Sequence, residues 1–326
     1  MKLPPHFHSD LMALVVDLED NLPPATAKAM AAKLLQIKNA IASVGVKTQA
    51  PSGHFYSPVV NPNAMGPYYM RRWQSRANRD AVEGVDIGAM RELWSSFVPY
   101  MQAYSFQKQK TEGHRYFLDN IYYGISDASI LVGVLNHFKP SRYFEIGSGF
   151  SSALALDVAQ NASWDIEFRF VEPYPEVRLD SLLSDEDRQR STIEKCFVQE
   201  IPLNWFQELN ENDILFIDST HVAKSGSDVI YLYLEILNLI NKGVVVHVHD
   251  IFFPFDYPPH WVINDNRSWN EAYILRAFLL GNDNFEVLFF NDAFGLHERE
   301  LIRQTYPSFL GTGATTGGSI WLRKSR

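Results

Sequence analysis

Residues 143–152 read YFEIGSGFSS, an apolar strand that runs into two glycines separated by one serine. The pattern predicts a strand, a tight turn and the start of a helix, which is how a nucleotide-binding loop begins. Ser152 stands where a dinucleotide loop would have its third glycine, and Glu145 comes just before the first glycine. A carboxylate about 4 Å from a phosphate would cost roughly 4 kcal/mol at an effective dielectric of about 20. The stretch therefore favours a positively charged ligand without phosphates, and a dinucleotide is the alternative.

Apolar strands alternate with helical segments from about residue 116 to the end of the chain. This order predicts a Rossmann-like α/β fold, a doubly wound and mostly parallel seven-stranded sheet with helices on both faces. We expect the ligand at the carboxyl ends of the strands, where the strand order reverses. The predicted strands are Arg142–Ile146, Phe168–Glu172, Glu194–Val198, Ile214–Asp218, Val244–Asp250, Phe285–Asn291 and Ser319–Arg323.

Helical segments are predicted between most of these strands. One of them has a sequence signal for its start, because Ser268 and Glu271 form an S-x-x-E capping box. We expect that helix to end at Gly281. The other predicted helices are Ser151–Gln160, about Ser181–Arg190 and Asp228–Asn241.

Residues 1–115 show no strong strand followed by a glycine loop. Pro24–Val44 is rich in helix-forming residues, and Val85–Gln107 has a second helical pattern. Gln49–Pro67 contains several prolines and glycines, which is typical of a loop. We therefore predict a mainly helical extension over residues 1–115 that helps to close the site of a domain spanning residues 116–326.

The glycine turn resembles the first motif of the class I S-adenosylmethionine-dependent methyltransferases, E/D-x-G-x-G, here Glu145, Gly147 and Gly149. The blocks EIGSGFSS, FIDSTH and VHVHDIFFPFDYP are also similar to an uncharacterised bacterial branch of these enzymes. The resemblance implies that Glu172, at the end of the second strand, binds the ribose hydroxyls of S-adenosylmethionine. It also implies that Gln199, after the third strand, lies near the adenine. The predicted cofactor-binding residues are Glu145, Gly147, Ser148, Gly149, Ser151, Glu172, Gln199 and Asp218.

Two neighbouring strands of this topology end in acids, Asp218 and Asp250. His221 follows the first acid, and His249 immediately precedes the second. We predict His249, Asp250 and His221 as catalytic residues, with a histidine as the base that takes the proton of an acceptor hydroxyl. His247 lies two residues deeper on the same face of its strand, and we predict it to be a hydrogen-bonded core residue.

The same acids raise the question of a metal. A Mg²⁺ ion on Asp218 and Asp250, with His249 as a further ligand, would lower the pKa of a bound hydroxyl. Histidine is a poor ligand for so hard an ion, and Ile251 follows Asp250 where metal-dependent relatives carry another acid or amide. A third alternative is that Asp218 orders only the loop and the cofactor.

An aromatic and proline-rich stretch, residues 251–261, directly follows Asp250 and reads IFFPFDYPPHW. A loop with so many aromatic side chains is expected to pack against another surface. The loop could form a wall of the acceptor pocket, pack on the N-terminal region, or make a dimer contact. The acceptor itself, expected to be a small molecule or glycan with a free hydroxyl, is not specified by the sequence.

The charge and composition narrow the class of partner. The formal net charge is −9 without any basic run, which argues against nucleic acid. Cys196 is the single cysteine, and the apolar run 11–16 is too short for a membrane span or a signal peptide. We therefore expect a cytoplasmic enzyme. The alternatives are a NAD-type dinucleotide oxidoreductase and a non-catalytic S-adenosylmethionine-binding protein, and a homo-oligomer remains open.

Overall fold

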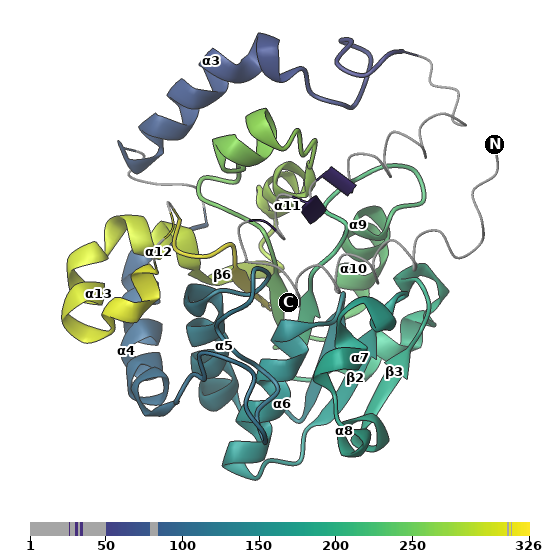
Figure 1. The fold of residues 1–326 in the computed structure, drawn as a ribbon, viewed down its shortest axis with the longest axis vertical. Coiled ribbons are helices and arrows are strands. Elements are labelled where there is room, and N and C mark those ends of the chain that lie inside the picture. The colour runs from purple at the N-terminus through teal and green to yellow at the C-terminus, as the bar shows by residue number, and fades with distance from the viewer. Residues whose placement is uncertain are drawn as a thin grey trace.

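The computed structural model describes residues 50–78, 84–311, 313 and 315–326, together with positions 26, 30, 31, 33 and 34. Its centre is a seven-stranded sheet with the order β3-β2-β1-β4-β5-β7-β6 (Figure 1). The first five strands are parallel, whereas β7 runs antiparallel to β5 and β6. The predicted fold is confirmed. The strands are β1 (Arg142–Ile146), β2 (Glu167–Val171), β3 (Ser191–Glu194), β4 (Ile214–Ile217), β5 (Val245–Val248), β6 (Phe285–Phe290) and β7 (Ile320–Lys324).

The strand order reverses at β1, which pairs with β2 on one side and β4 on the other. The chain therefore leaves β1 in one direction and crosses back to β4, so that the carboxyl ends of these strands form a crevice. All five residues of β1 except the first are buried, as are all four residues of β4 and of β5. Continuous apolar burial of this kind is what a parallel sheet covered on both faces requires.

Helices cover the sheet, and α4, α5 and α6 pack side by side in Figure 1. A Cβ on Gly133 of α5 would lie 2.6 Å from the Phe97 ring of α4, so that this glycine permits the close approach. A π-helical turn, Leu232–Ile236, joins α9 to α10. The helices are α3 (Pro62–Gln74), α4 (Ile87–Ala103), α5 (Ile125–Phe138), α6 (Phe150–Ala162), α7 (Leu179–Leu182), α8 (Asp185–Arg190), α9 (Asp228–Tyr231), α10 (Leu237–Leu239), α11 (Glu271–Leu279), α12 (Asn291–His297) and α13 (Arg299–Thr305).

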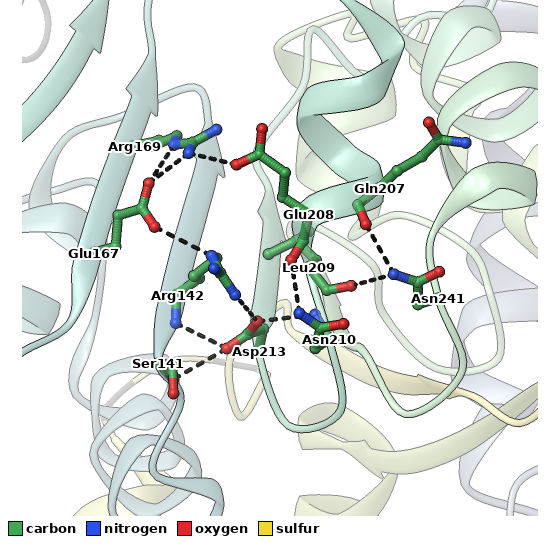
Figure 2. Close-up of polar contacts among 10 residues, drawn as sticks. All are labelled: Ser141, Arg142, Glu167, Arg169, Gln207, Glu208, Leu209, Asn210, Asp213 and Asn241. Carbon is green, nitrogen blue, oxygen red and sulfur yellow. Dashed lines mark hydrogen bonds and ion pairs between the residues drawn. The ribbon is translucent and has the colours of Figure 1, made fainter.

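A polar network links the segments that lead into β1 and β4, and Figure 2 shows its side chains. The buried Asp213 carboxylate, just before β4, accepts the backbone N–H groups of Ser141 and Arg142 at 3.0 and 2.8 Å. It also accepts the backbone N–H of Asn210 at 2.8 Å. Because Asp213 bonds to groups on both sides of the β1–β4 pair, it fixes the register of the two strands that carry the site.

The described part of the N-terminal region packs onto the domain. Met90, Trp94 and Phe97 of α4 are fully buried in the same core as the sheet residues. Helix α3 starts inside the segment predicted as a loop, with Asn61 accepting from the backbone N–H of Asn63 as its N-cap and Pro62 at its first position. The predicted helix Pro24–Val44 lies almost wholly outside the described residues.

Two predicted boundaries are wrong. The third strand covers Ser191–Glu194, not Glu194–Val198, and Val198 begins a short 3₁₀ turn, Val198–Glu200. The predicted capping box does not form, since α11 begins after Asn270 without a side-chain cap. The Ser268 hydroxyl instead accepts the backbone N–H of Val60 at 2.9 Å, and the Glu271 carboxylate accepts from side chains described below.

Candidate active site

The glycine loop after β1 is held against the end of β4. Gly147 has φ +81°, and a Cβ there would overlap the carbonyl oxygen of Asp218 and lie 3.0 Å from its carbonyl carbon. The Gly147 N–H donates to the Val171 carbonyl at 2.9 Å, and the Asp218 N–H donates to that of Ile146 at 2.8 Å. Position 147 therefore requires glycine for two reasons: its backbone is left-handed, and there is no room for a side chain.

Glu145 lies beneath this loop. It is fully buried, and its carboxylate accepts a hydrogen bond from the Ser151 hydroxyl in the first turn of α6. Burial, with a smaller contribution from the nearby Asp218, raises the pKa of the Glu145 carboxyl to about 8, although hydrogen bonds from Ser151 and Ser152 oppose the shift. The sequence analysis gave Glu145 a direct charge contact with the ligand. The structure places it under the loop, where it orients Ser151 and the start of α6.

A pH-dependent stability difference follows from this burial. The folded state keeps the Glu145 proton up to about pH 8, whereas an unfolded glutamic acid releases it near pH 4.3. Stability is therefore lost as the pH rises between these values, by roughly 1.4 kcal/mol per unit. Between pH 5 and pH 7 the wild type is expected to lose about 2.5 kcal/mol more than Glu145→Gln in urea unfolding. The exposed Glu286→Gln is the control, and parallel profiles for wild type and Glu145→Gln would contradict the assignment.

The rest of the loop is ordered by residues that the motif alone does not specify. Ser152, which replaces the third glycine, accepts the Gly149 N–H at 3.0 Å with its hydroxyl. The side chain of Arg178 occupies the space that a Cβ on Gly149 would fill, at 2.8 Å, and its guanidinium lies 3.7 Å from the centre of the Tyr122 ring. The Ser148 hydroxyl is buried and finds no hydrogen-bond partner among the described residues. The sequence analysis missed Arg178.

A cavity of about 410 Å³ opens at the carboxyl ends of β1, β2 and β4. Glu172 lines it and accepts the Tyr174 N–H at 2.9 Å. Gln199 donates to the Gly226 carbonyl at 2.9 Å, while its side-chain oxygen is buried and has no partner among the described residues. The cavity lining includes Gly147, Glu172, Gln199 and Asp218 of the predicted set, together with the rings of Tyr174 and Phe197. Ser148, Gly149, Ser151 and Glu145 are not in this lining.

His221 lies at the centre of a cluster of carboxylates beside the cavity. Its Nε2 is 3.5 Å from a carboxylate oxygen of Asp218 and 3.5 Å from one of Asp250, and its Nδ1 is 2.9 Å from Glu271. Burial opposes the charged imidazolium, but hydrogen bonds to Asp218 and Glu271 raise the pKa of His221 well above its usual range. We therefore expect His221 to be protonated at neutral pH, which makes it a partner of the acids and not a base.

The backbone of this cluster is strained. His221 and Asp250 both adopt left-handed φ values, +61° and +57°, which non-glycine residues rarely do. Such strain persists only where surrounding contacts fix the conformation, and it is concentrated at functional sites. The structure thus brings the predicted catalytic residues together. Glu271, which was predicted only as part of a helix cap, is fully buried and also accepts from the Ser219 and Tyr233 hydroxyls at 2.8 and 3.2 Å.

His249 lies on the other side of Asp250. Its Nε2 is 3.7 Å from the Asp250 carboxylate, and its Nδ1 is buried without a partner among the described residues. Burial lowers the pKa of His249, but Asp250, Asp218 and Asp127 together outweigh it and raise the pKa above the usual value. The histidines also shift the pKa of Asp218. Burial would raise that pKa, but the neighbouring His249 and His221 lower it below its usual value.

His247 is a core residue, as predicted. It is fully buried, its Nε2 is 2.9 Å from the Ser319 hydroxyl, and its ring stacks on Phe216 at 3.7 Å. Burial lowers its pKa well below the usual range, so that the ring is neutral. The residue therefore supports β5 as part of the core.

Asp218, Asp250 and His249 were considered above as ligands of a Mg²⁺ ion, as one of three alternatives. Within residues 50–78, 84–311 and the described C-terminal positions, no group of three or more His, Cys, Asp and Glu side chains is placed to hold a metal ion. Asp218 and Asp250 are instead paired with the two histidines. An imidazolium between two carboxylates already supplies the positive charge that a cation would bring.

The aromatic loop after Asp250 packs on the N-terminal region, one of the predicted alternatives. Its Phe252, Phe253 and Tyr257 side chains are buried. Arg76, beyond α3, donates to the Phe253 carbonyl at 3.3 Å and forms an ion pair with Asp292.

No helix within the described ranges is long and apolar enough to cross a membrane.

Comparison with known proteins identifies the family. The family described as a methyltransferase domain matches residues 144–251. An uncharacterized protein of Archaeoglobus fulgidus is 30% identical over 171 residues, which are 50% of this chain and 75% of that protein. The methyltransferase PaMTH1 of Podospora anserina, solved with S-adenosylhomocysteine, is 15% identical with a TM-score of 0.41, covering 86% of this chain and 100% of its own. The plantazolicin methyltransferase BpumL is 10% identical with a TM-score of 0.38, covering 80% and 92%.

The matched domain begins in β1 and ends one residue after Asp250, so that it contains the glycine loop, both acids and both histidines of the site. The chain belongs to the class I S-adenosylmethionine-dependent methyltransferases.

Proposed function

We propose that the protein transfers the methyl group of S-adenosylmethionine to a hydroxyl oxygen of a small molecule or glycan. The observation that carries the proposal is the cavity between Gly147 and two strand-end carboxylates, Glu172 and Asp218. His249 and His221 lower the pKa of Asp218, so that it is ionised at neutral pH. A sulfonium and an ammonium suit such a wall, whereas the pyrophosphate of a dinucleotide would face negative charge. The oxidoreductase alternative is therefore disfavoured.

The cofactor residues take distinct roles in this proposal. The glycine loop offers backbone groups at close range to the cavity, because Gly147 has no side chain. Glu172 accepts from the ribose hydroxyls. The unpartnered side-chain oxygen of Gln199 accepts from the adenine amino group, and the neighbouring Phe197 ring covers the base.

His249 is the proposed general base. S-adenosylmethionine supplies a methyl group on a positively charged sulfur. The acceptor hydroxyl gives its proton to the neutral imidazole of His249, whose protonated form Asp250 then stabilises at 3.7 Å. His221, held protonated between acids, keeps Asp218 and Asp250 in position. We propose a reaction without a metal, since the imidazolium of His221 already lies beside both Asp218 and Asp250.

His249→Gln is expected to reduce methyl transfer at least about 100-fold while leaving the affinity for S-adenosylhomocysteine unchanged. In the wild type, kcat/KM should rise with pH along a limb whose midpoint lies above 6.5, because the carboxylates around His249 raise its pKa. S-adenosylhomocysteine formation would be followed with a panel of phenols, sugars and hydroxy acids. His260→Gln, an exposed residue on the aromatic loop, is the control.

Full turnover by His249→Gln would remove the assignment of the base. If the wild type binds S-adenosylhomocysteine but turns over no acceptor of any class, the non-catalytic binding protein becomes the better account. The affinity for S-adenosylhomocysteine and the rate of methyl transfer are measured separately for each variant. A loss of cofactor binding is therefore distinguished from a loss of catalysis.

A further inference from the structure

A second cavity, of about 580 Å³, lies between α3 and the segment that runs from the aromatic loop into α11. Its walls are mostly apolar and come from two distant parts of the chain. We call it the aromatic cavity, and the lining residues that matter here are Met65, Tyr68, Val262, Arg267, Trp269 and Tyr273. None of the predicted site residues lines it.

The wall formed by α3 is fixed by one carboxylate. Asp256 of the aromatic loop is buried and accepts from the Tyr69 hydroxyl, from Arg72 Nε at 2.7 Å and from the Tyr273 hydroxyl at 2.8 Å. A carboxylate with three donors from two helices holds those helices at a set distance. The cavity is therefore a built feature of the fold, and the charge of Arg72 is already matched by Asp256.

The aromatic cavity adjoins the catalytic cluster through Trp269. The ring of Trp269 lies 4.3 Å from the ring of His221, and the Asn270 N–H donates to the His221 carbonyl at 3.0 Å. His221 in turn lies 3.5 Å from Asp218, which lines the cofactor cavity. His221 therefore lies between Trp269, which lines the aromatic cavity, and Asp218, which lines the cofactor cavity.

One positive charge in the aromatic cavity is open to a ligand. The Arg267 guanidinium lies over the rings of Trp261 and Trp269, 4.2 and 4.9 Å from their centres. Its ion pair is with Asp265 at 3.3 Å, and that side chain is 45% exposed. An exposed pair of this kind contributes little, so a ligand anion can replace it. A planar arginine on two indoles also provides a flat surface on which a further ring can stack.

We infer that the aromatic cavity is a second ligand site of the fold, which binds a flat aromatic compound with an anionic group that faces Arg267. This site is distinct from the cofactor cavity, and the inference goes beyond the proposed function without depending on it.

The inference is tested by calorimetry on the full chain saturated with S-adenosylhomocysteine. Three probes distinguish the contribution of the aromatic ring to binding from that of the negative charge. They are a hydroxynaphthoate, the corresponding uncharged naphthol, and cyclohexanecarboxylate. Hydroxynaphthoate should bind once per chain, and each of the other two should bind about tenfold more weakly. Arg267→Gln should weaken hydroxynaphthoate about tenfold and leave naphthol unchanged, whereas Tyr68→Ala should weaken both. Arg303→Gln, on the distant and exposed face of α13, should change neither.

The outcomes are distinguishable. If S-adenosylhomocysteine binds but hydroxynaphthoate does not bind at about 1 mM, the inference fails and the proposed function stands. If hydroxynaphthoate binds equally well to Arg267→Gln and Tyr68→Ala, its site is elsewhere and the inference also fails. If S-adenosylhomocysteine itself does not bind, the proposed function fails first. Thermal unfolding of each variant confirms that the chain is folded.

Discussion

Gly147→Ala is expected to abolish S-adenosylhomocysteine binding and to lower the free energy of unfolding by about 2–4 kcal/mol. Alanine at φ +81° costs about 1–2 kcal/mol on its own. The new Cβ would also overlap the Asp218 carbonyl oxygen, so that the ends of β1 and β4 must move apart. That movement displaces both walls of the cofactor cavity, which is why binding is lost together with stability.

Gly113→Ala is a matched control, because Gly113 has the same φ of +81° and nothing lies within 4 Å of its would-be Cβ. Gly113→Ala should lower the free energy of unfolding by only the backbone cost of about 1–2 kcal/mol. It should leave the binding of S-adenosylhomocysteine unchanged. Urea unfolding and calorimetry measure the two effects separately. If Gly147→Ala were no worse than Gly113→Ala in both, the close approach of the glycine loop to Asp218 would not be needed for the site.

His221→Ala is expected to have the next largest effect, a loss of about 3–5 kcal/mol in the free energy of unfolding at pH 6. The substitution leaves Asp218, Asp250 and the fully buried Glu271 without their shared cation. The pKa of His221 is raised in the folded state. Its stabilisation is therefore fully present below about pH 6.5 and is lost as the pH rises through the folded-state pKa.

The cluster is tested by unfolding His221→Ala, Glu271→Gln and the double variant at pH 6 and at pH 9. Because the two residues are in direct contact, the double variant should be less destabilised than the sum of the single ones, by at least about 1 kcal/mol at pH 6. The exposed His260→Ala should stay within about 0.5 kcal/mol of wild type. Additive losses that do not depend on pH would show that His221 is not the cation of the cluster.

The parallel core of the fold was predictable because its signals are local. β1 matches the predicted Arg142–Ile146, and β4 and β5 differ from prediction only at their ends. Helix α5 was missed because nearly every one of its residues is buried, which removes the amphipathic period that reveals a helix. Helices α12 and α13, between β6 and β7, were not among the predicted helices.

The site was predictable where it lies directly at the strand ends and not where it depends on tertiary contacts. Asp218, His221, His249 and Asp250 do converge. The partner of His221 is Glu271, 50 residues further on, and its position suggested a helix cap. The helix start does not use Ser268 and Glu271, because Val60 and His221 offer them partners from elsewhere in the fold. Only such long-range contacts reveal that the aromatic loop and α3 enclose a second cavity.

Calorimetric titration of the wild-type chain with S-adenosylhomocysteine tests the central claim most directly. The account predicts one binding site per chain with a Kd below about 100 µM, no measurable binding of NAD⁺, and loss of the signal in Gly147→Ala. A chain that is folded by thermal unfolding yet binds no S-adenosylhomocysteine at about 1 mM would contradict the account, and so would tight binding of NAD⁺ in its place.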